Sequence, residues 1–257
     1  MKQFKTLSLS LIALLSSLAS FSQNLPVIQP AGLQAPQGIN IDGKPNEWGG
    51  NFQAFNRATS VFYTMANDDK NLYMVIKCEE QPTIAKILSG GITLALKSAA
   101  NKEAQAVKIV YPLISYTDKY TISIPLREDA DVEKMAITLN KELPKVAKQI
   151  NVSGISEIKE PSVSIYNDWD IKAVSAVDTK RAYTIEWQVP LKYLRHLISA
   201  DGSFDYNIIV NGVVNPPGTI VVGGGRIGGA PPKLNEAAAF DMFNPTDFKG
   251  SYTLMKK

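Results

Sequence analysis

The sequence contains a single cysteine and a single histidine among its 257 residues. One thiol, Cys78, excludes an internal disulfide, a CxxC redox pair and a cysteine-rich metal site. One imidazole, His196, argues against a multi-histidine zinc site and against a His-dependent catalytic triad. The sequence therefore lacks the residues for much of the familiar enzyme chemistry.

The sequence also has little net charge, with 27 Lys and Arg against 24 Asp and Glu. Removing residues 1–22 would take away Lys2 and Lys5 and leave 25 basic against 24 acidic residues. A near-neutral chain offers no electrostatic attraction to nucleic acid or acidic lipid, so neither is expected as a partner. The content of 45% hydrophobic and 20% charged residues is typical of a globular protein.

Residues 1–22 have the parts of a secretory signal peptide. Lys2 and Lys5 precede the apolar run Leu7–Leu18, which is too short to span a bilayer. Small residues follow, and cleavage is expected between Ala19 and Gln23. No cysteine follows the run, so a lipoprotein anchor is not expected, and no later segment is apolar enough for a membrane span. We expect Sec-type export to the periplasm or beyond the cell; a buried N-terminal helix is the alternative.

A Pro- and Gly-containing lead-in or linker at residues 23–37 precedes one expected domain at residues 38–257. Apolar residues in this domain alternate with polar or small ones, and a period of two predicts strands. The predicted strands are Ile39–Ile41, Ser60–Met65, Leu72–Cys78, Ile92–Lys97, Val107–Leu113, Tyr120–Leu126, Val163–Tyr166, Ile171–Val177, Tyr183–Leu191, Tyr206–Val210 and Ser251–Leu254.

One segment has helical spacing instead. Met135, Leu139 and Leu143 predict an amphipathic helix at about residues 131–150, kinked or split at Pro144. Many strands, one inserted helix and no βαβ repeat predict a mainly β fold, an antiparallel β-sandwich.

Three segments, taken in their order along the chain, carry a resemblance to a known family: Ile41–Trp48 (IDGKPNEW), Tyr63–Ile76 (YTMANDDKNLYMVI) and Tyr183–Leu191 (YTIEWQVPL). Together they resemble family 9 carbohydrate-binding modules, which are jelly-roll or DOMON-like β-sandwiches, and exported proteins of this kind in Bacteroidetes-like bacteria. The resemblance implies a non-catalytic module that binds the ends of polysaccharide chains between aromatic side chains, often with bound calcium. The pair of clamp tryptophans of that family has no residue-by-residue match here.

Trp169 is the predicted platform for a sugar ring, because it lies in a polar segment, YNDWD. The apolar C–H face of a sugar packs on an indole, and its hydroxyls bind Asp, Asn and Arg side chains. Asn167, Asp168 and Asp170 are the predicted hydrogen-bonding partners. A tryptophan packed on the edge of the sandwich is the alternative.

The remaining tryptophans, the cysteine and the histidine are expected to be structural. Trp187 shares a strand face with Ile185 and Val189, which predicts a core position, and Trp48 follows a turn, where it would seal one end of the sandwich. Cys78 is in phase with the apolar face of its strand. His196 lies in Leu191–Ile198, a candidate short helix or 3₁₀ turn, where it would cap or pack that element.

Asn67, Asp68 and Asp69 carry oxygens that could ligate calcium, the one cofactor that the sequence suggests. We favour a plain hairpin turn, because the ligand spacing of an EF-hand loop is absent. The glycine-rich segment Val221–Gly229 has no following helix for phosphate binding, so it is expected to be a surface loop. Arg226 in that loop would close over a ligand.

The sequence predicts an exported, non-catalytic protein that binds polysaccharide or oligosaccharide. An envelope scaffold without a sugar site, with other envelope proteins as partners, is the alternative. A glycoside hydrolase could use a pair drawn from Asp168, Asp170 and Glu186, but with so many acidic residues some pair is always available. A haem-binding sensor would need an axial partner for His196 that the sequence does not place.

Overall fold

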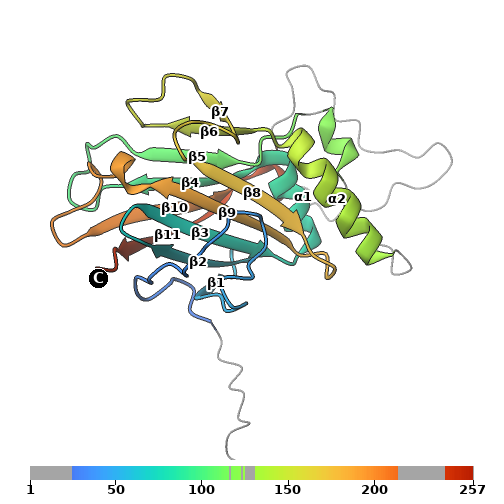
Figure 1. The fold of residues 1–257 in the computed structure, drawn as a ribbon, viewed down its shortest axis with the longest axis horizontal. Coiled ribbons are helices and arrows are strands. Elements are labelled where there is room, and N and C mark those ends of the chain that lie inside the picture. Colours follow the sequence, from blue (N-terminus) through green and yellow to red (C-terminus); the bar gives the residue numbers. More distant parts are fainter. Residues whose placement is uncertain (1–24, 116, 123, 125–130, 214–240, 257) are drawn as a thin grey trace, which may run out of the picture.

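The computed structural model describes residues 25–115, 117–122, 124, 131–213 and 241–256. Their strands form two antiparallel sheets that share one hydrophobic core (Figure 1). Sheet A has the order β1-β2-β3-β9-β8, with β1 (Ala54–Asn56), β2 (Val61–Asn67), β3 (Asn71–Cys78), β9 (Tyr183–Pro190) and β8 (Lys172–Val177). Sheet B has the order β11-β10-β4-β5-β6-β7, with β11 (Thr246–Thr253), β10 (Ser203–Val210), β4 (Ile92–Lys97), β5 (Val107–Tyr111), β6 (Gln149–Ser153) and β7 (Ser162–Ser164). The predicted antiparallel β-sandwich is confirmed.

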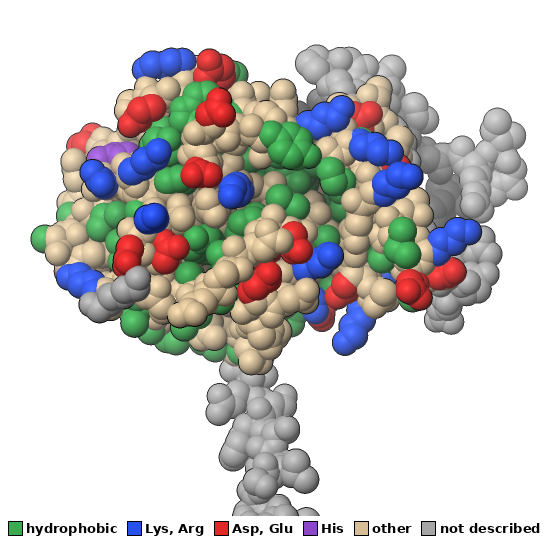
Figure 2. All heavy atoms as spheres, in the orientation of Figure 1, with side chains coloured by type: hydrophobic (Ala, Val, Ile, Leu, Met, Phe, Trp, Pro, Cys, Tyr) green, Lys and Arg blue, Asp and Glu red, His purple; other side chains and the backbone are tan. Residues whose placement is uncertain are grey.

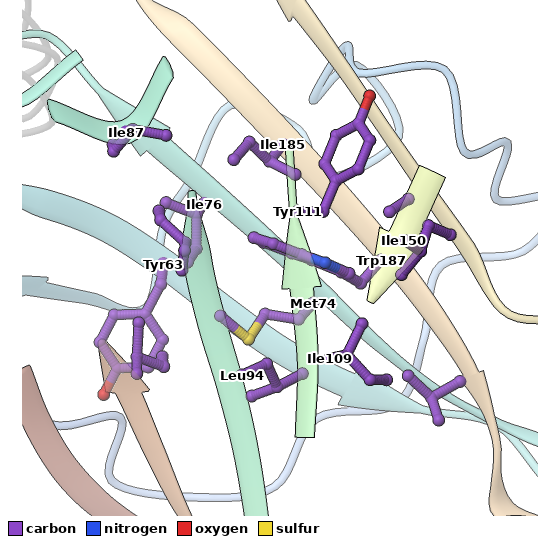
Figure 3. Close-up of a cluster of buried hydrophobic side chains, with 14 of the residues drawn as sticks. Tyr63, Met74, Ile76, Ile87, Leu94, Ile109, Tyr111, Ile150, Ile185 and Trp187 are labelled. Atoms are coloured by element: carbon purple, nitrogen blue, oxygen red, sulfur yellow. The ribbon is translucent and has the colours of Figure 1, made fainter. Parts of the chain in front are cut away.

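The core lies between the two sheets, and every second side chain of a strand points into it. In β3, Met74 and Ile76 are buried on the inner face, and Trp187 of β9 pairs with Met74 in the ladder (Figure 3). Cys78 continues that face and is buried. Full burial of a large apolar side chain stabilises the fold by about 1.5–3 kcal/mol. The predicted core positions of Trp187 and Cys78 are therefore confirmed.

Two tyrosines join the sheets through the core. The hydroxyls of Tyr63 on β2 and Tyr206 on β10 lie 2.8 Å apart, and the backbone N–H of Gln29 donates to Tyr63 at 2.9 Å. Gly250 of β11 stands opposite Tyr206 in the ladder. A Cβ at residue 250 would meet the Tyr206 ring at less than 3 Å, so the glycine makes room for the phenol.

Residues 33–52 cover the outer face of sheet A. Trp48 is buried there against Tyr73 and Val75 of β3, so its predicted structural role is confirmed, but it covers the outer face of sheet A and not one end of the sandwich. Ile39 and Ile41 pack on the same cluster without forming a strand, so the strand predicted at Ile39–Ile41 is wrong. Apolar side chains can pack on a sheet without strand pairing by their own backbone, so the alternation of Ile39 and Ile41 did not distinguish a covering segment from a strand.

Two α-helices lie at one end of the sandwich (Figure 1). α2 (Val132–Val146) confirms the predicted amphipathic helix, and the Asp131 side chain caps it by accepting from Lys134 N. The predicted span to residue 150 was too long, because the chain leaves the helix after Val146 and enters β6. Pro144 lies in the last turn, where the helix runs through it.

The sequence interpretation missed α1 (Gln81–Gly90), which carries Pro82 at its start and Ile84, Ile87 and Leu88 at helical spacing. The 3₁₀ turn η2 (Leu191–Tyr193) confirms a short element within Leu191–Ile198, but it ends before His196, which was expected to lie in it. Another 3₁₀ turn, η1 (Asp118–Thr121), occupies the beginning of the strand predicted at Tyr120–Leu126, which is therefore wrong there.

No described helix is both long enough and apolar enough to cross a membrane. The predicted signal peptide and the glycine-rich segment with Arg226 lie outside the described residues.

Candidate functional site

The loop between β7 and β8, residues 165–171, holds most of the predicted sugar-binding residues. The Asn167 side chain organises it: Oδ1 accepts from the backbone N–H groups of Trp169 and Ile171, and Nδ2 donates to the carbonyls of Ser164 and Ile171 at 2.8 and 2.7 Å. An amide with both donor hydrogens used on the backbone fixes the loop. Asn167 therefore positions its neighbours and has no free hydrogen for a sugar.

The turn between β2 and β3 is held in the same way. Asp68 Oδ1 accepts from the N–H groups of Lys70 and Asn71, both at 2.7 Å, and Oδ2 accepts from the Tyr73 hydroxyl at 2.9 Å. Burial, with this hydrogen bond to a carboxylate, raises the pKa of Tyr73 to about 12. The hairpin-turn interpretation fits this geometry, which leaves Asp69 and Lys70 exposed at the tip.

Asn67, at the end of β2, ties the two sheets together. Its Nδ2 donates to the carbonyls of Asp68 and Met255, and its Oδ1 accepts from the Tyr252 hydroxyl and from Met255 N–H. The Asn67 oxygen predicted as a calcium ligand is thus engaged within the protein. Among the described residues, no group of three His, Cys, Asp or Glu side chains is arranged to hold a metal ion. Calcium binding stays a prediction.

Two hydrogen bonds bring three distant segments to one end of sheet A. Leu191 N–H, just after β9, donates to the Lys70 carbonyl in the turn at 2.7 Å. The Gln188 side chain of β9 donates to the Asp170 carbonyl in the β7–β8 loop at 3.3 Å. Asp170 adopts a left-handed φ of 59°, which Asp tolerates better than most residues. The β2–β3 turn, the β7–β8 loop and the segment after β9 therefore form one surface.

These segments enclose a cleft of about 380 Å³, hereafter the β9-exit cleft. Its volume falls within the range of roughly 300–1,000 Å³ found for small-molecule sites. The lining residues are Asp69, Lys70, Asn71, Asp170, Pro190, Leu191, Lys192, Arg195 and Ile198. His196 directly follows Arg195 in the sequence. In Figure 2 this histidine is purple, and basic and acidic side chains lie near it on the surface.

The structure brings Asp69 and Asp170 together in this cleft, although the sequence assigned them to different sites. Trp169 precedes Asp170 but is partly buried and packs against the core, as the edge-packed alternative expected. No described residue that lines the cleft is aromatic. Asp168 is exposed and lies outside the lining, and the aromatic side chain that the loop presents to solvent is Tyr166, which is 84% exposed.

Glu186 of β9 is a fully buried carboxylate on the outer face of sheet A. Its Oε2 accepts from the N–H groups of Asp42 and Gly43 at 3.0 and 2.8 Å, and its Oε1 accepts from Trp48 Nε1 at 2.8 Å. Gly43 has a φ of 81°, and a Cβ there would lie 2.6 Å from the backbone of β8. The carboxylate thus binds IDGKPNEW to YTIEWQVPL, two of the segments that carry the resemblance.

This position removes Glu186 from the candidate hydrolase pairs, since a carboxylate with no exposed surface cannot reach a substrate. Burial raises the pKa of Glu186 to about 6, although its three hydrogen bonds act in the opposite direction. His196 is exposed, and its Nε2 lies 3.2 Å from the carbonyl of Gln105 in the segment between β4 and β5, so its contact is with another segment and not with the short element that it was expected to cap or pack.

No protein-family model and no curated protein matches the sequence. A search of solved structures finds a likeness to a family 9 carbohydrate-binding module from Caldicellulosiruptor kristjanssonii in complex with glucose. The two are 8% identical, the match covers 88% of this chain and 95% of that one, and the TM-score is 0.41. At this identity and TM-score, the likeness carries no conclusion about the function of this chain.

Sequence interpretation missed several lining residues, above all Lys192 and Arg195. The available signal was the placement of two cations directly after a buried strand that ends at Pro190, in a segment expected to be a 3₁₀ turn. Exposed residues at the end of a rigid strand are well placed for binding.

Proposed function

We propose that the chain is a carbohydrate-binding protein whose ligand occupies the β9-exit cleft. The observation that supports this is the composition of the lining, which combines an apolar floor with a polar rim. The floor consists of Pro190, Leu191 and Ile198, and the rim includes Asp69, Asn71, Asp170, Lys192 and Arg195. A sugar ring has an apolar face for the floor and hydroxyls that pair with carboxylate, amide and guanidinium groups.

The rim is held in place before a ligand arrives. Lys70 and Leu191 are joined backbone to backbone, and the Gln188 side chain holds the carbonyl of Asp170. A preformed rim spares the ligand the entropy cost of ordering loops. The proposal is a binding role without catalysis, performed after export as residues 1–22 predict, on a polysaccharide or oligosaccharide.

The test is a glycan array with the full chain, followed by calorimetry with each glycan that binds. Asp170→Asn keeps a residue that tolerates the left-handed conformation and removes one rim carboxylate. We expect it to weaken binding by about tenfold, which is about 1.4 kcal/mol. Asp247→Asn, on the exposed outer face of β11, is the matched control and should bind as the wild type does. Absence of binding to every glycan, or equal binding by Asp170→Asn, contradicts the proposal.

Fluorescence locates the ligand independently. Trp48 and Trp187 are buried, so Trp169 is the indole that solvent reaches, one residue from Asp170. A glycan in the cleft is expected to change the tryptophan emission, and Trp169→Phe should abolish the change. If the change persists in Trp169→Phe, the ligand binds elsewhere.

A further inference from the structure

We propose that the β9-exit cleft selects acidic glycans, whose sugar rings carry a carboxylate, as in uronic acid residues. This inference rests on the proposed function, because it names the class of sugar that the same cleft takes. Two observations support it: the lining holds more cations than carboxylates, and its cations form no ion pairs with other described residues.

Positive charge exceeds negative charge in the lining. Lys70, Lys192 and Arg195 face two carboxylates, Asp69 and Asp170. Lys172, the first residue of β8, places its Nζ 3.9 Å from Asp170 Oδ1 and neutralises part of that negative charge.

The three cations of the lining are available to a ligand. Each is exposed, and none forms an ion pair with another described residue. Lys192 Nζ lies 4.7 Å from the centroid of the ring of its neighbour Tyr193. Some lysines elsewhere in the described chain do form ion pairs: Lys77 with Glu79 at 2.8 Å, Lys102 with Asp205 at 3.2 Å and Lys145 with Glu142 at 2.6 Å.

The arrangement suits a ring and a carboxylate together. The planar guanidinium of Arg195 can hold both oxygens of a carboxylate, and the two lysines add attraction at longer range. The floor of Pro190, Leu191 and Ile198 accepts the apolar face of the ring. A neutral sugar would leave three cations without a partner, and a small inorganic anion would leave the floor uncovered.

The experiment compares two ligands that share the same sugar rings, one with charged carboxylates and one with these groups converted to neutral methyl esters. Calorimetry with the full chain uses a four-residue oligogalacturonate and its fully methyl-esterified form, which keeps the rings and removes the carboxylates. We expect the acid to bind at least about tenfold more tightly than the ester, with the difference shrinking as sodium chloride is added. Arg195→Gln should weaken binding of the acid by about tenfold and leave the ester within about twofold.

Lys141→Gln is the matched control, because Lys141 is an exposed cation on α2, which contacts β8 at the end away from the cleft. The Lys141→Gln protein should bind the acid with the same affinity as the wild type. Equal binding of acid and ester, or displacement of the acid by equimolar sodium acetate, overturns the inference. If neutral glycans bind and uronates do not, only this inference fails; if no glycan of either kind binds, the proposed function fails with it.

Discussion

At the scale of single residues, the least expected feature is the buried carboxylate of Glu186. Its three hydrogen bonds come from two backbone N–H groups and one indole N–H on that face. A side chain that the sequence offered as a catalytic acid instead connects the covering segment of sheet A to β9. An acidic residue within an alternating strand cannot be assigned to one role or the other until its partners are known.

Glu186→Ala is expected to destabilise the protein strongly, because it leaves two buried donors, Gly43 N–H and Trp48 Nε1, and the partly buried N–H of Asp42 without this acceptor. The expected loss is about 3 kcal/mol in the free energy of unfolding, measured by urea denaturation. Glu103→Ala, which removes an exposed carboxylate, should change stability by no more than about 0.5 kcal/mol. Similar losses for the two variants would contradict the role assigned to Glu186.

The same carboxylate should give stability a pH dependence. Burial raises the pKa of Glu186 in the folded state to about 6, above its usual 4.5. A raised pKa means that the folded state binds the proton more tightly than the unfolded state does. The contribution is therefore fully present below about pH 4.5 and is lost as the pH rises through about 6. The stability difference between wild type and Glu186→Ala should shrink over that window in urea titrations; a widening difference refutes this.

Cys78 offers a probe of the core, because it is the only thiol in the chain. Burial raises its pKa to about 12, so the native protein at about pH 8 should hold about a thousandfold less thiolate than the unfolded chain. We expect a colourimetric disulfide reagent to label Cys78 in urea and to leave the native protein almost unlabelled. Rapid labelling without urea would place this thiol at the surface.

At the scale of elements, strands were predictable where a segment pairs within a sheet and directs alternate side chains into the core. β3 and β9 follow a period of two because their inner side chains fill the core. Alternation failed at Ile39–Ile41, where the chain packs on a sheet without pairing, and at Tyr120, where it turns. α1 was not predicted because its ten residues contain only three apolar core positions, and so few positions do not establish a helical period between two predicted strands.

α2 protects the edge of sheet A by a side-chain bond. Asn140 Nδ2 donates to the Val177 carbonyl at 2.9 Å, and Asn140 Oδ1 accepts from Val177 N–H at 2.8 Å. An edge strand without a partner exposes such groups. Asn140→Ala should lower the free energy of unfolding by about 1–2 kcal/mol and speed hydrogen exchange at Val177. Lys141→Ala, on the exposed face of the same helix, should change neither, and unchanged exchange in Asn140→Ala would show that the bond is dispensable.

At the scale of the whole molecule, the cleft was less predictable than the fold. Asp170 and Asp69 were found from local composition, because acidic residues in turns stand out in a sequence. Their proximity depends on the pairing of β3 with β9, which are more than a hundred residues apart, and on the bond from Leu191 to Lys70. Local patterns carry no information on such pairing, so the partnership of Asp69 and Asp170 with Arg195 required the structure.

The two sheets should behave as one cooperative unit because hydrogen bonds cross the core between them. The Tyr63 and Tyr206 hydroxyls lie 2.8 Å apart, one from each sheet, with rings at 6.2 Å between centroids. Tyr63→Phe and Tyr206→Phe should each cost about 1–2 kcal/mol, and the double variant should cost about 1 kcal/mol less than their sum. Urea unfolding of the four proteins measures this coupling.

The control cycle pairs Tyr63→Phe with Tyr111→Phe, whose hydroxyl lies 3.4 Å from Ser175 and shares no partner with Tyr63. Those two losses should add within about 0.5 kcal/mol. Additivity in both cycles would mean that the bond between Tyr63 and Tyr206 does not couple the two sheets. Coupling confined to Tyr63 and Tyr206 would instead assign this pair a specific role in fixing one sheet against the other, since a hydroxyl that loses its partner in the core cannot turn to water.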